Sequence, residues 1–151
     1  MKIAIIGAGA IGGYVGARLA LAGEDVTFLV RGANLEAIGR DGIRLVARDG
    51  SEQVARNVRA TNDYAAAGAQ DVVVLALKAH QVGAVAADVP KLLDDRIAVV
   101  TMQNGLPYWY FHGHGGALAG NALHSVDPDG SIARGIPPQR VLGCVVYPAA
   151  A

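Results

Sequence analysis

The sequence lacks features that mark several specialised classes of protein. It has a single cysteine in 151 residues, Cys144, which excludes an internal disulfide and fits a reducing compartment. Thirteen basic residues balance thirteen acidic ones, so no overall positive field attracts nucleic acid or an anionic membrane. We therefore expect a cytoplasmic chain that binds neither nucleic acid nor membrane, and any anion site must be local.

The N-terminal segment superficially resembles a secretory signal peptide, but its glycine content argues against one. Lys2 is followed by an uncharged stretch over residues 3–17, and five of these fifteen residues are glycine. Such a segment suits a tight turn better than an apolar helix. The stretch ends at Arg18 and is too short to span a bilayer. We expect no signal peptide.

Hydrophobic residues are what the sequence has in abundance, at 52% of the chain. Short apolar runs predict buried strands at residues 2–6, 25–30, 71–77, 96–102 and 140–147. Helical spacing predicts helices at residues 10–22, ended by Gly23, at 35–40, capped by Asn34 and stopped near Gly42, and at 80–93. The Asp49-Gly50 pair predicts a hairpin within residues 43–58, and the stretch 105–139 is expected to be irregular.

This alternation of strands and helices predicts an α/β fold. We expect a Rossmann-type, doubly wound, mostly parallel sheet with helices on both faces. The length fits one domain.

A glycine-rich hexamer follows the first predicted strand. Gly7-Ala8-Gly9-Ala10-Ile11-Gly12 matches the pattern GxGxxG and lies between a strand and a helix, as a dinucleotide-binding loop requires. Gly7 permits the sharp turn, Gly9 lets a pyrophosphate approach the backbone, and Gly12 lets the helix press onto the strand. The helix N-terminus would offer N–H groups to the phosphates. The alternative is a glycine-rich turn without a ligand.

The end of the second predicted strand indicates which dinucleotide is bound. Domains that bind NAD place an acid here, about 20 residues beyond the glycines, to hold the ribose 2′-hydroxyl. In this sequence Arg31 stands nineteen residues after Gly12, and no acid occupies the strand end. A guanidinium can hold a 2′-phosphate with two hydrogen bonds, so we predict NADP(H). The alternative is a solvated arginine at the start of a loop.

Two further polar groups follow predicted strands, where ligands bind in open α/β sheets. Lys78 could offer a cation to a phosphate or a carboxylate, and Asn104 could hold an amide or a hydroxyl. The alternatives are a lysine that merely extends into solvent and an Asn-Gly turn.

Other residues favour structural roles. Four of the eight aromatic residues occupy positions 108–111, where they roof the cleft, meet a second domain or form a local cluster. His112 and His114 have no third ligand at metal-site spacing, so no metal is expected. Cys144 lies within a predicted strand and is expected to be a small buried hydrophobe.

Together these motifs resemble the 2-dehydropantoate 2-reductases, also called ketopantoate reductases. The matching segments are GAGAIG at 7–12, LVRG at 29–32, LKAHQ at 77–81, QNG at 103–105 and LGCVVYPAA at 142–150. The resemblance runs in order over essentially the whole chain. It implies an enzyme that reduces 2-dehydropantoate to pantoate in pantothenate biosynthesis by transferring a hydride from NADPH.

The resemblance also implies roles for individual residues. It assigns NADPH binding to the glycine loop, Arg31, Lys78 and Ala149, and it assigns Asn104 to both cofactor and substrate. The family's general-acid lysine lies in a helical C-terminal domain that this sequence does not contain.

The expected organisation follows from that assignment. Residues 1–151 are expected to form an NADP-binding Rossmann domain with no catalytic residue of its own, inactive as an isolated fragment. Its partners would be a keto acid substrate and the missing C-terminal domain, and a homodimer is left open.

Two other functions stay open. The stretch 105–139 is longer and richer in glycine and proline than in compact members of the family, so the substrate could be a different 2-keto or 3-keto acid. The other is a regulatory nucleotide-sensing module, similar to the gating domains of potassium transporters. Those modules usually keep an acid where this chain has Arg31.

Overall fold

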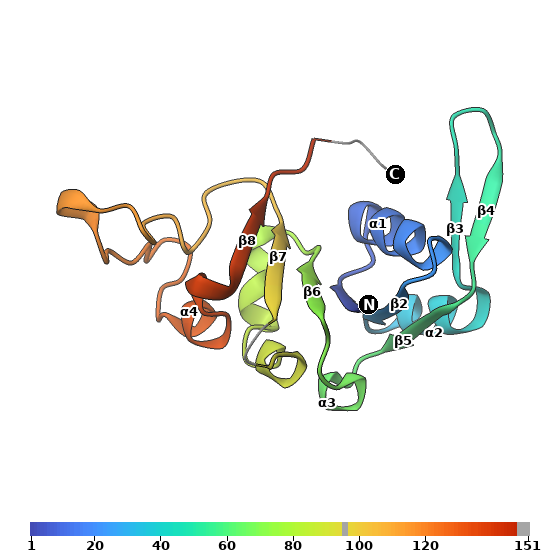
Figure 1. Ribbon diagram of the computed structural model, residues 1–151, viewed down its shortest axis with the longest axis horizontal. Helices are drawn as coiled ribbons and strands as arrows, with labels where there is room; N and C mark the ends of the chain where they lie inside the picture. Colours follow the sequence, from blue (N-terminus) through green and yellow to red (C-terminus); the bar gives the residue numbers. More distant parts are fainter. Residues whose placement is uncertain (95–96, 148–151) are drawn as a thin grey trace.

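The structure, a computed structural model, describes residues 1–94 and 97–147. A six-stranded sheet in the order β5-β2-β1-β6-β7-β8 forms its centre, and each neighbouring pair is parallel (Figure 1). The strands are β1 (Lys2–Ile6), β2 (Asp25–Leu29), β5 (Val58–Thr61), β6 (Val72–Leu75), β7 (Ala98–Met102) and β8 (Val141–Cys144). A separate antiparallel hairpin pairs β3 (Ile43–Val46) with β4 (Glu52–Ala55), as predicted.

Helices connect the strands. The α-helices are α1 (Ala10–Leu21), α2 (Ala33–Asp41), α3 (Tyr64–Ala67) and α4 (Ser131–Gly135). The 3₁₀ segments are η1 (Ala79–Ala84), η2 (Val89–Leu92), η3 (Gly116–Leu118) and η4 (Pro138–Arg140). Within the described part of the chain, no helix combines the length and the apolar character needed to cross a bilayer.

Both faces of the sheet bury a core, because alternate residues of a strand point to opposite faces. Ile3 and Ile5 of β1 pack on the side of α1 and α2. Ala4 and Ile6 pack on the other side, against η1, η2 and α4. The expected doubly wound α/β fold with helices on both faces is therefore confirmed.

Small residues allow α1 to lie close to the sheet. A Cβ atom added at Gly16 would stand 2.3 Å from Cζ of Phe28, which belongs to β2. Ala17 and Ala20, one and four residues further along, are fully buried on the same face of the helix. This close packing fixes where α1 begins, and therefore where its N-terminus faces.

The helix predicted over residues 80–93 is wrong in type and continuity. The chain forms η1 and η2 instead, separated by turns, with contacts of the i→i+3 kind such as Val85 N–H to Val82 O at 3.0 Å. Pro90 has no N–H to donate to a carbonyl one turn earlier, and Gly83 weakens a helix interior. The segment still buries Val82 and Val89 against the sheet.

Three other predictions need correction. Helix α2 begins at Ala33 with Gly32 as its N-cap, so Asn34 lies inside the helix and does not cap it. The edge strand β5 and the short helix α3 were not predicted. Cys144 ends β8 and is half-buried rather than buried.

The stretch 105–139 is more ordered than expected, because it contains η3, α4 and the start of η4. The buried Asp127 carboxylate accepts hydrogen bonds from the N–H groups of Ile132 and Ala133, at 3.0 and 2.9 Å, and so caps α4. Tyr108 donates a hydrogen bond to the Ile136 carbonyl at 2.7 Å. These contacts favour the local cluster among the roles considered for the aromatic residues.

Candidate functional site

A cavity of about 460 Å³ lies where β1, β2, β5 and β6 end. The volume is within the roughly 300–1,000 Å³ typical of small-molecule sites. The strand order reverses between β1 and β6, and in open α/β sheets ligands bind at such a switch point. Of the residues expected to bind a cofactor, five line it: Gly7, Ala8, Gly9, Arg31 and Lys78.

The glycine loop passes directly from β1 into α1, and its three glycines differ in their surroundings. Gly7 has a φ of +98°, a backbone conformation that L side chains rarely adopt. A Cβ atom at Gly12 would lie 2.1 Å from the Gly7 carbonyl oxygen. A Cβ atom at Gly9 would meet nothing within 4 Å, so this side of the loop is open.

The N-terminus of α1 faces this loop without a side-chain cap. Gly9 is the N-cap, and the first turn contains no acidic residue. The N–H groups of a first turn have no partner within the helix, and the helix dipole adds a partial positive charge there. The loop therefore presents hydrogen-bond donors suited to an anion.

Arg31 follows β2 and begins the turn into α2. Its side chain is exposed, and no hydrogen bond or ion pair engages its guanidinium within residues 1–94 and 97–147. Asn34, in the first turn of α2, lines the same cavity. This corner of the cavity thus offers a guanidinium and an amide, both able to donate hydrogen bonds to an oxyanion.

Lys78 and Gln81 are held together by a local turn. The Lys78 N–H donates to Gln81 Oε1 at 3.1 Å, and the Gln81 N–H donates to the Lys78 carbonyl at 2.8 Å. Both residues line the cavity. With its Oε1 fixed on the backbone, Gln81 keeps its amide N–H₂ group to donate to a ligand.

Asn62, Tyr64 and Asp88 also line the cavity and were not predicted. Burial raises the pKa of Tyr64 to about 12, the charge of Asp88 adds to the rise, and Arg31 opposes it. The Asp88 carboxylate forms an ion pair with Lys91 at 2.7 Å, which offsets its charge. The Tyr64 hydroxyl is therefore a neutral hydrogen-bond donor near neutral pH.

These residues were missed for identifiable reasons. Asn62 and Tyr64 follow β5, a strand that was not predicted, so their place at the carboxyl edge was not foreseen. Gln81 belongs to the LKAHQ segment quoted above, three residues after Lys78, and that spacing could have identified it.

Asn104 lies outside the cavity, and its side-chain amide is engaged elsewhere. Its Nδ2 donates to the Val146 carbonyl at 3.0 Å, and its Oδ1 accepts from the Val146 N–H at 2.9 Å. Gln103 Nε2 donates to the Leu77 carbonyl at 2.9 Å. These side chains join the ends of β6, β7 and β8, so Asn104 holds backbone in this structure.

The remaining expected residues have other surroundings. Ala10 lines a second groove, between α1 and the β3–β4 hairpin, which shares Ala8 and Gly9 with the cavity, and neither Ile11 nor Gly12 lines the cavity. Ala149 lies outside the described residues. In the described part of the chain, no three His, Cys, Asp or Glu residues gather as a metal site would require.

Comparisons with known proteins agree with this arrangement. The sequence model of the family described as ketopantoate reductase PanE/ApbA matches residues 3–109. The chain is 56% identical over 150 residues to the 2-dehydropantoate 2-reductase of Mesorhizobium japonicum. The matched segment covers 99% of this chain and 45% of that protein.

Solved structures give the same result. A candidate ketopantoate reductase from Ralstonia solanacearum MolK2 has a TM-score of 0.89 and 49% identity, over 97% of this chain and 44% of that one. A PanE/ApbA family ketopantoate reductase from Ralstonia eutropha JMP134 has a TM-score of 0.73 and 29% identity, over 99% and 42%. The chain spans less than half the length of these relatives.

Proposed function

The chain belongs to the ketopantoate reductase PanE/ApbA family, and we propose that it is the NADPH-binding part of an enzyme that reduces 2-dehydropantoate to pantoate in pantothenate biosynthesis. The observation that carries this proposal is the cavity. It brings the glycine loop, Arg31 and Lys78 together at the switch point of the sheet, although they come from three separate parts of the chain.

The open side of the glycine loop fits a dinucleotide. Nothing in the protein fills the space at Gly9, whereas the neighbouring uncapped N-terminus of α1 offers donors. A pyrophosphate is the group that uses both features, because it needs close backbone approach and unpaired N–H groups. Gly7, Ala8 and Gly9 would hold it.

Arg31 supports NADPH over NADH. Arg31 follows β2 and lines the cavity, as Asn34 does, and no acid occupies positions 30–34. Arginine can bind a 2′-phosphate through two charge-assisted hydrogen bonds, whereas the 2′-hydroxyl of NADH offers it no negative charge. Lys78 would add a second cation to the phosphates or to the substrate carboxylate.

Reduction of a keto acid needs a hydride and a proton. NADPH, when bound, supplies the hydride. The residues of this chain hold and orient that cofactor. The general acid that protonates the developing alkoxide is assigned to the rest of the protein, as in the family, together with most contacts to the substrate.

Asn104 is proposed to contact cofactor and substrate, following the family. Its amide hydrogen bonds hold the Val146 backbone in this structure. Contact with a ligand through that amide therefore requires it to exchange these bonds or to add to them. Ala149 stays a proposed cofactor contact on the resemblance alone.

The activity of the isolated chain tests the proposal that it binds NADPH while the rest of the protein supplies the general acid. We expect the chain to bind NADPH, seen as a change in nicotinamide fluorescence, and to leave the NADPH absorbance band unchanged when 2-dehydropantoate is added. A positioned general acid typically contributes ~10²–10⁴-fold, and the family resemblance assigns that acid to the C-terminal half of the enzyme. Turnover at enzyme-like rates that is abolished by Lys78→Ala would show that Lys78 is the acid and would overturn the proposal.

A further inference from the structure

On the face of the sheet that α1 covers, the side chains become more exposed from β1 toward β8. Residues in register across four strands point to the α1 side: Ile5, Val74, Val100 and Leu142. Ile5 and Val74 are 0% and 5% exposed, Val100 is half-buried, and Leu142 is 59% exposed. The burial that α1 provides over β1 therefore fades across the sheet.

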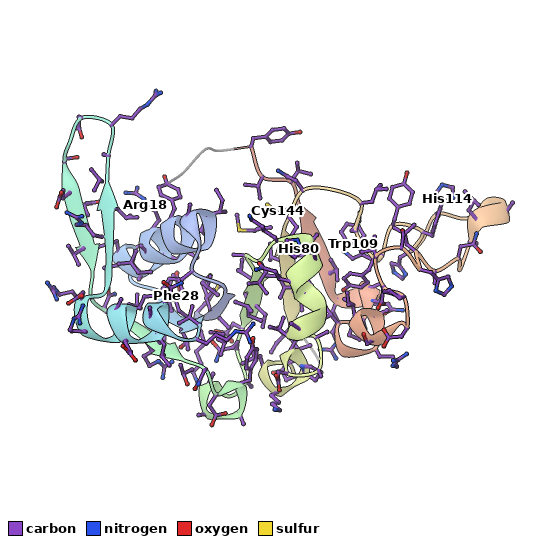
Figure 2. The ribbon with its side chains drawn as sticks, turned by 180° about the vertical axis from the view of Figure 1, so that it is seen from behind. Arg18, Phe28, His80, Trp109, His114 and Cys144 are labelled. Atoms are coloured by element: carbon purple, nitrogen blue, oxygen red, sulfur yellow. The ribbon has the colours of Figure 1, made fainter. Side chains whose placement is uncertain are left out.

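The opposite face of the same strands is covered. Val99 and Val73 are buried against η1, η2 and α4, and the half-buried Val141 packs on the same cluster. Figure 2 shows the helical segment with His80 in front of the strands. Figure 1, from the other side, shows no helix of the described residues in front of β7 and β8.

The thinly covered surface, which we call the β7–β8 patch, consists of Val100, Met102, Leu142 and Cys144. Val100 and Met102 are half-buried at the margin of the core on the α1 side, Cys144 is half-buried, and Leu142 is exposed. Met102 and Cys144 are in register and follow Val100 and Leu142 by two residues, so all four share a face. The patch contains no charge. It spans two strands beside β6, a width of about 10 Å at ~4.8 Å per strand, which equals the diameter of one α-helix.

We propose that one apolar helix face from the remaining half of the protein docks on the β7–β8 patch. This inference rests on the proposed function, which places that half after β8. The relatives are more than twice as long as this chain, so an occupant of sufficient size exists in them. Because β8 itself carries Leu142 and Cys144, polypeptide that follows β8 begins beside the patch.

A helix is the occupant that the rest of the sheet favours. Parallel sheets are generally covered on both faces, and α1 already covers the β1–β2 part of this face. A helix over β7 and β8 would complete the same layer. A second copy of the chain is the alternative occupant that the experiment distinguishes.

Cys144 is a built-in reporter, since it lies in the patch and is the single cysteine. A chimera would join the 151 residues to the part of the Mesorhizobium japonicum protein beyond its matched segment, with cysteines of that part changed to serine. Maleimide labelling of Cys144 should be at least tenfold slower in the chimera than in the isolated chain. Leu142→Glu should restore the faster rate.

Val46→Glu is the matched control, because Val46 on the hairpin is 60% exposed and Leu142 is 59% exposed. It should leave labelling of the chimera slow. Should the chimera not fold, the Mesorhizobium protein with a cysteine substituted at the position matching Leu142 takes its place, and labelling must be slow there too.

Equal labelling rates in the isolated chain and the chimera would overturn the inference. So would a dimer of the isolated chain in sedimentation that protects Cys144 and is dissociated by Leu142→Glu. NADPH titration of the same samples keeps the two proposals apart. Binding with an unprotected Cys144 refutes the docking alone, and protection without NADPH binding refutes the proposed function.

Discussion

Gly12 and Gly9 lie on opposite sides of the glycine loop, and a different constraint requires glycine at each position. On the side that faces the sheet, Gly12 is enclosed, because a Cβ atom would lie 2.1 Å from the Gly7 oxygen and 2.8 Å from the Ala76 Cβ. On the side that faces the cavity, Gly9 has open space around it. The fold requires glycine at position 12. At position 9 only a ligand could require it.

Substitution by valine should therefore damage a different property at each position: stability at Gly12 and cofactor binding at Gly9. Gly12→Val has the larger effect on stability. The new side chain meets backbone that cannot move away, so we expect a loss of about 3 kcal/mol in the free energy of unfolding. For a domain of this size the melting temperature should fall by roughly 10 °C. Thermal circular dichroism measures it. An unchanged melting temperature would refute the close packing of α1 on β1 and β6.

Gly9→Val should leave the domain folded and remove binding. Gly9 has a φ of −69° and a ψ of −176°, which valine adopts readily, and the poorer N-cap should cost about 1 kcal/mol or less. A side chain there occupies the path of the pyrophosphate, so neither NADPH nor NADH should bind. Calorimetric titration of a variant shown to be folded checks this. Normal NADPH binding would mean that the loop is only a turn.

The parts of the site that rest on local sequence patterns could be predicted, and the parts that rest on an unpredicted strand could not. Strand β1, the glycine hexamer and Arg31 were found because each is a local pattern with a fixed spacing. Strand β5 was missed because Val58–Thr61 is short, carries a charge and lies at the sheet edge, where no continuous apolar run is needed. Asn62 and Tyr64, which follow this strand and line the cavity, were missed for the same reason.

Other features could not be predicted because they depend on contacts between residues that are far apart in the sequence. Asn104 was predicted as a ligand contact, and its amide partner Val146 is 42 residues away, where no sequence pattern records the pairing. Asp127 lies in the stretch expected to be irregular, yet its buried carboxylate caps α4. Apolar periodicity also could not separate an α-helix from the η1 and η2 segments.

The smallest expected effect is on stability at high pH, from the substitution Tyr64→Phe in the lining of the cavity. Its pKa is about 12 in the folded chain and near 10 when unfolded, so stability from its neutral form is complete below pH 10 and lost as the pH rises toward 12. Tyr64→Phe should therefore retain about 1 kcal/mol more stability than the unmodified chain at pH 11, with little difference at pH 7.

Urea unfolding at the two pH values measures this difference. Tyr147→Phe, at a side chain that is 89% exposed, is the control and should behave as the unmodified chain. If Tyr64→Phe and the unmodified chain lose the same amount of stability between pH 7 and pH 11, Tyr64 is not desolvated in the cavity wall.

The central claim is that the open side of the loop, together with Arg31, forms an NADPH site. Titration of the unmodified chain and of Arg31→Ala with NADPH and NADH tests it most directly, with Arg56→Ala as an exposed arginine outside the cavity. Charge-assisted contacts contribute about 1.5–3 kcal/mol, so NADPH should bind at least about tenfold more tightly than NADH. Arg31→Ala should abolish that preference and leave NADH affinity unchanged, and Arg56→Ala should keep it. Equal affinity of the unmodified chain for the two cofactors would contradict the account.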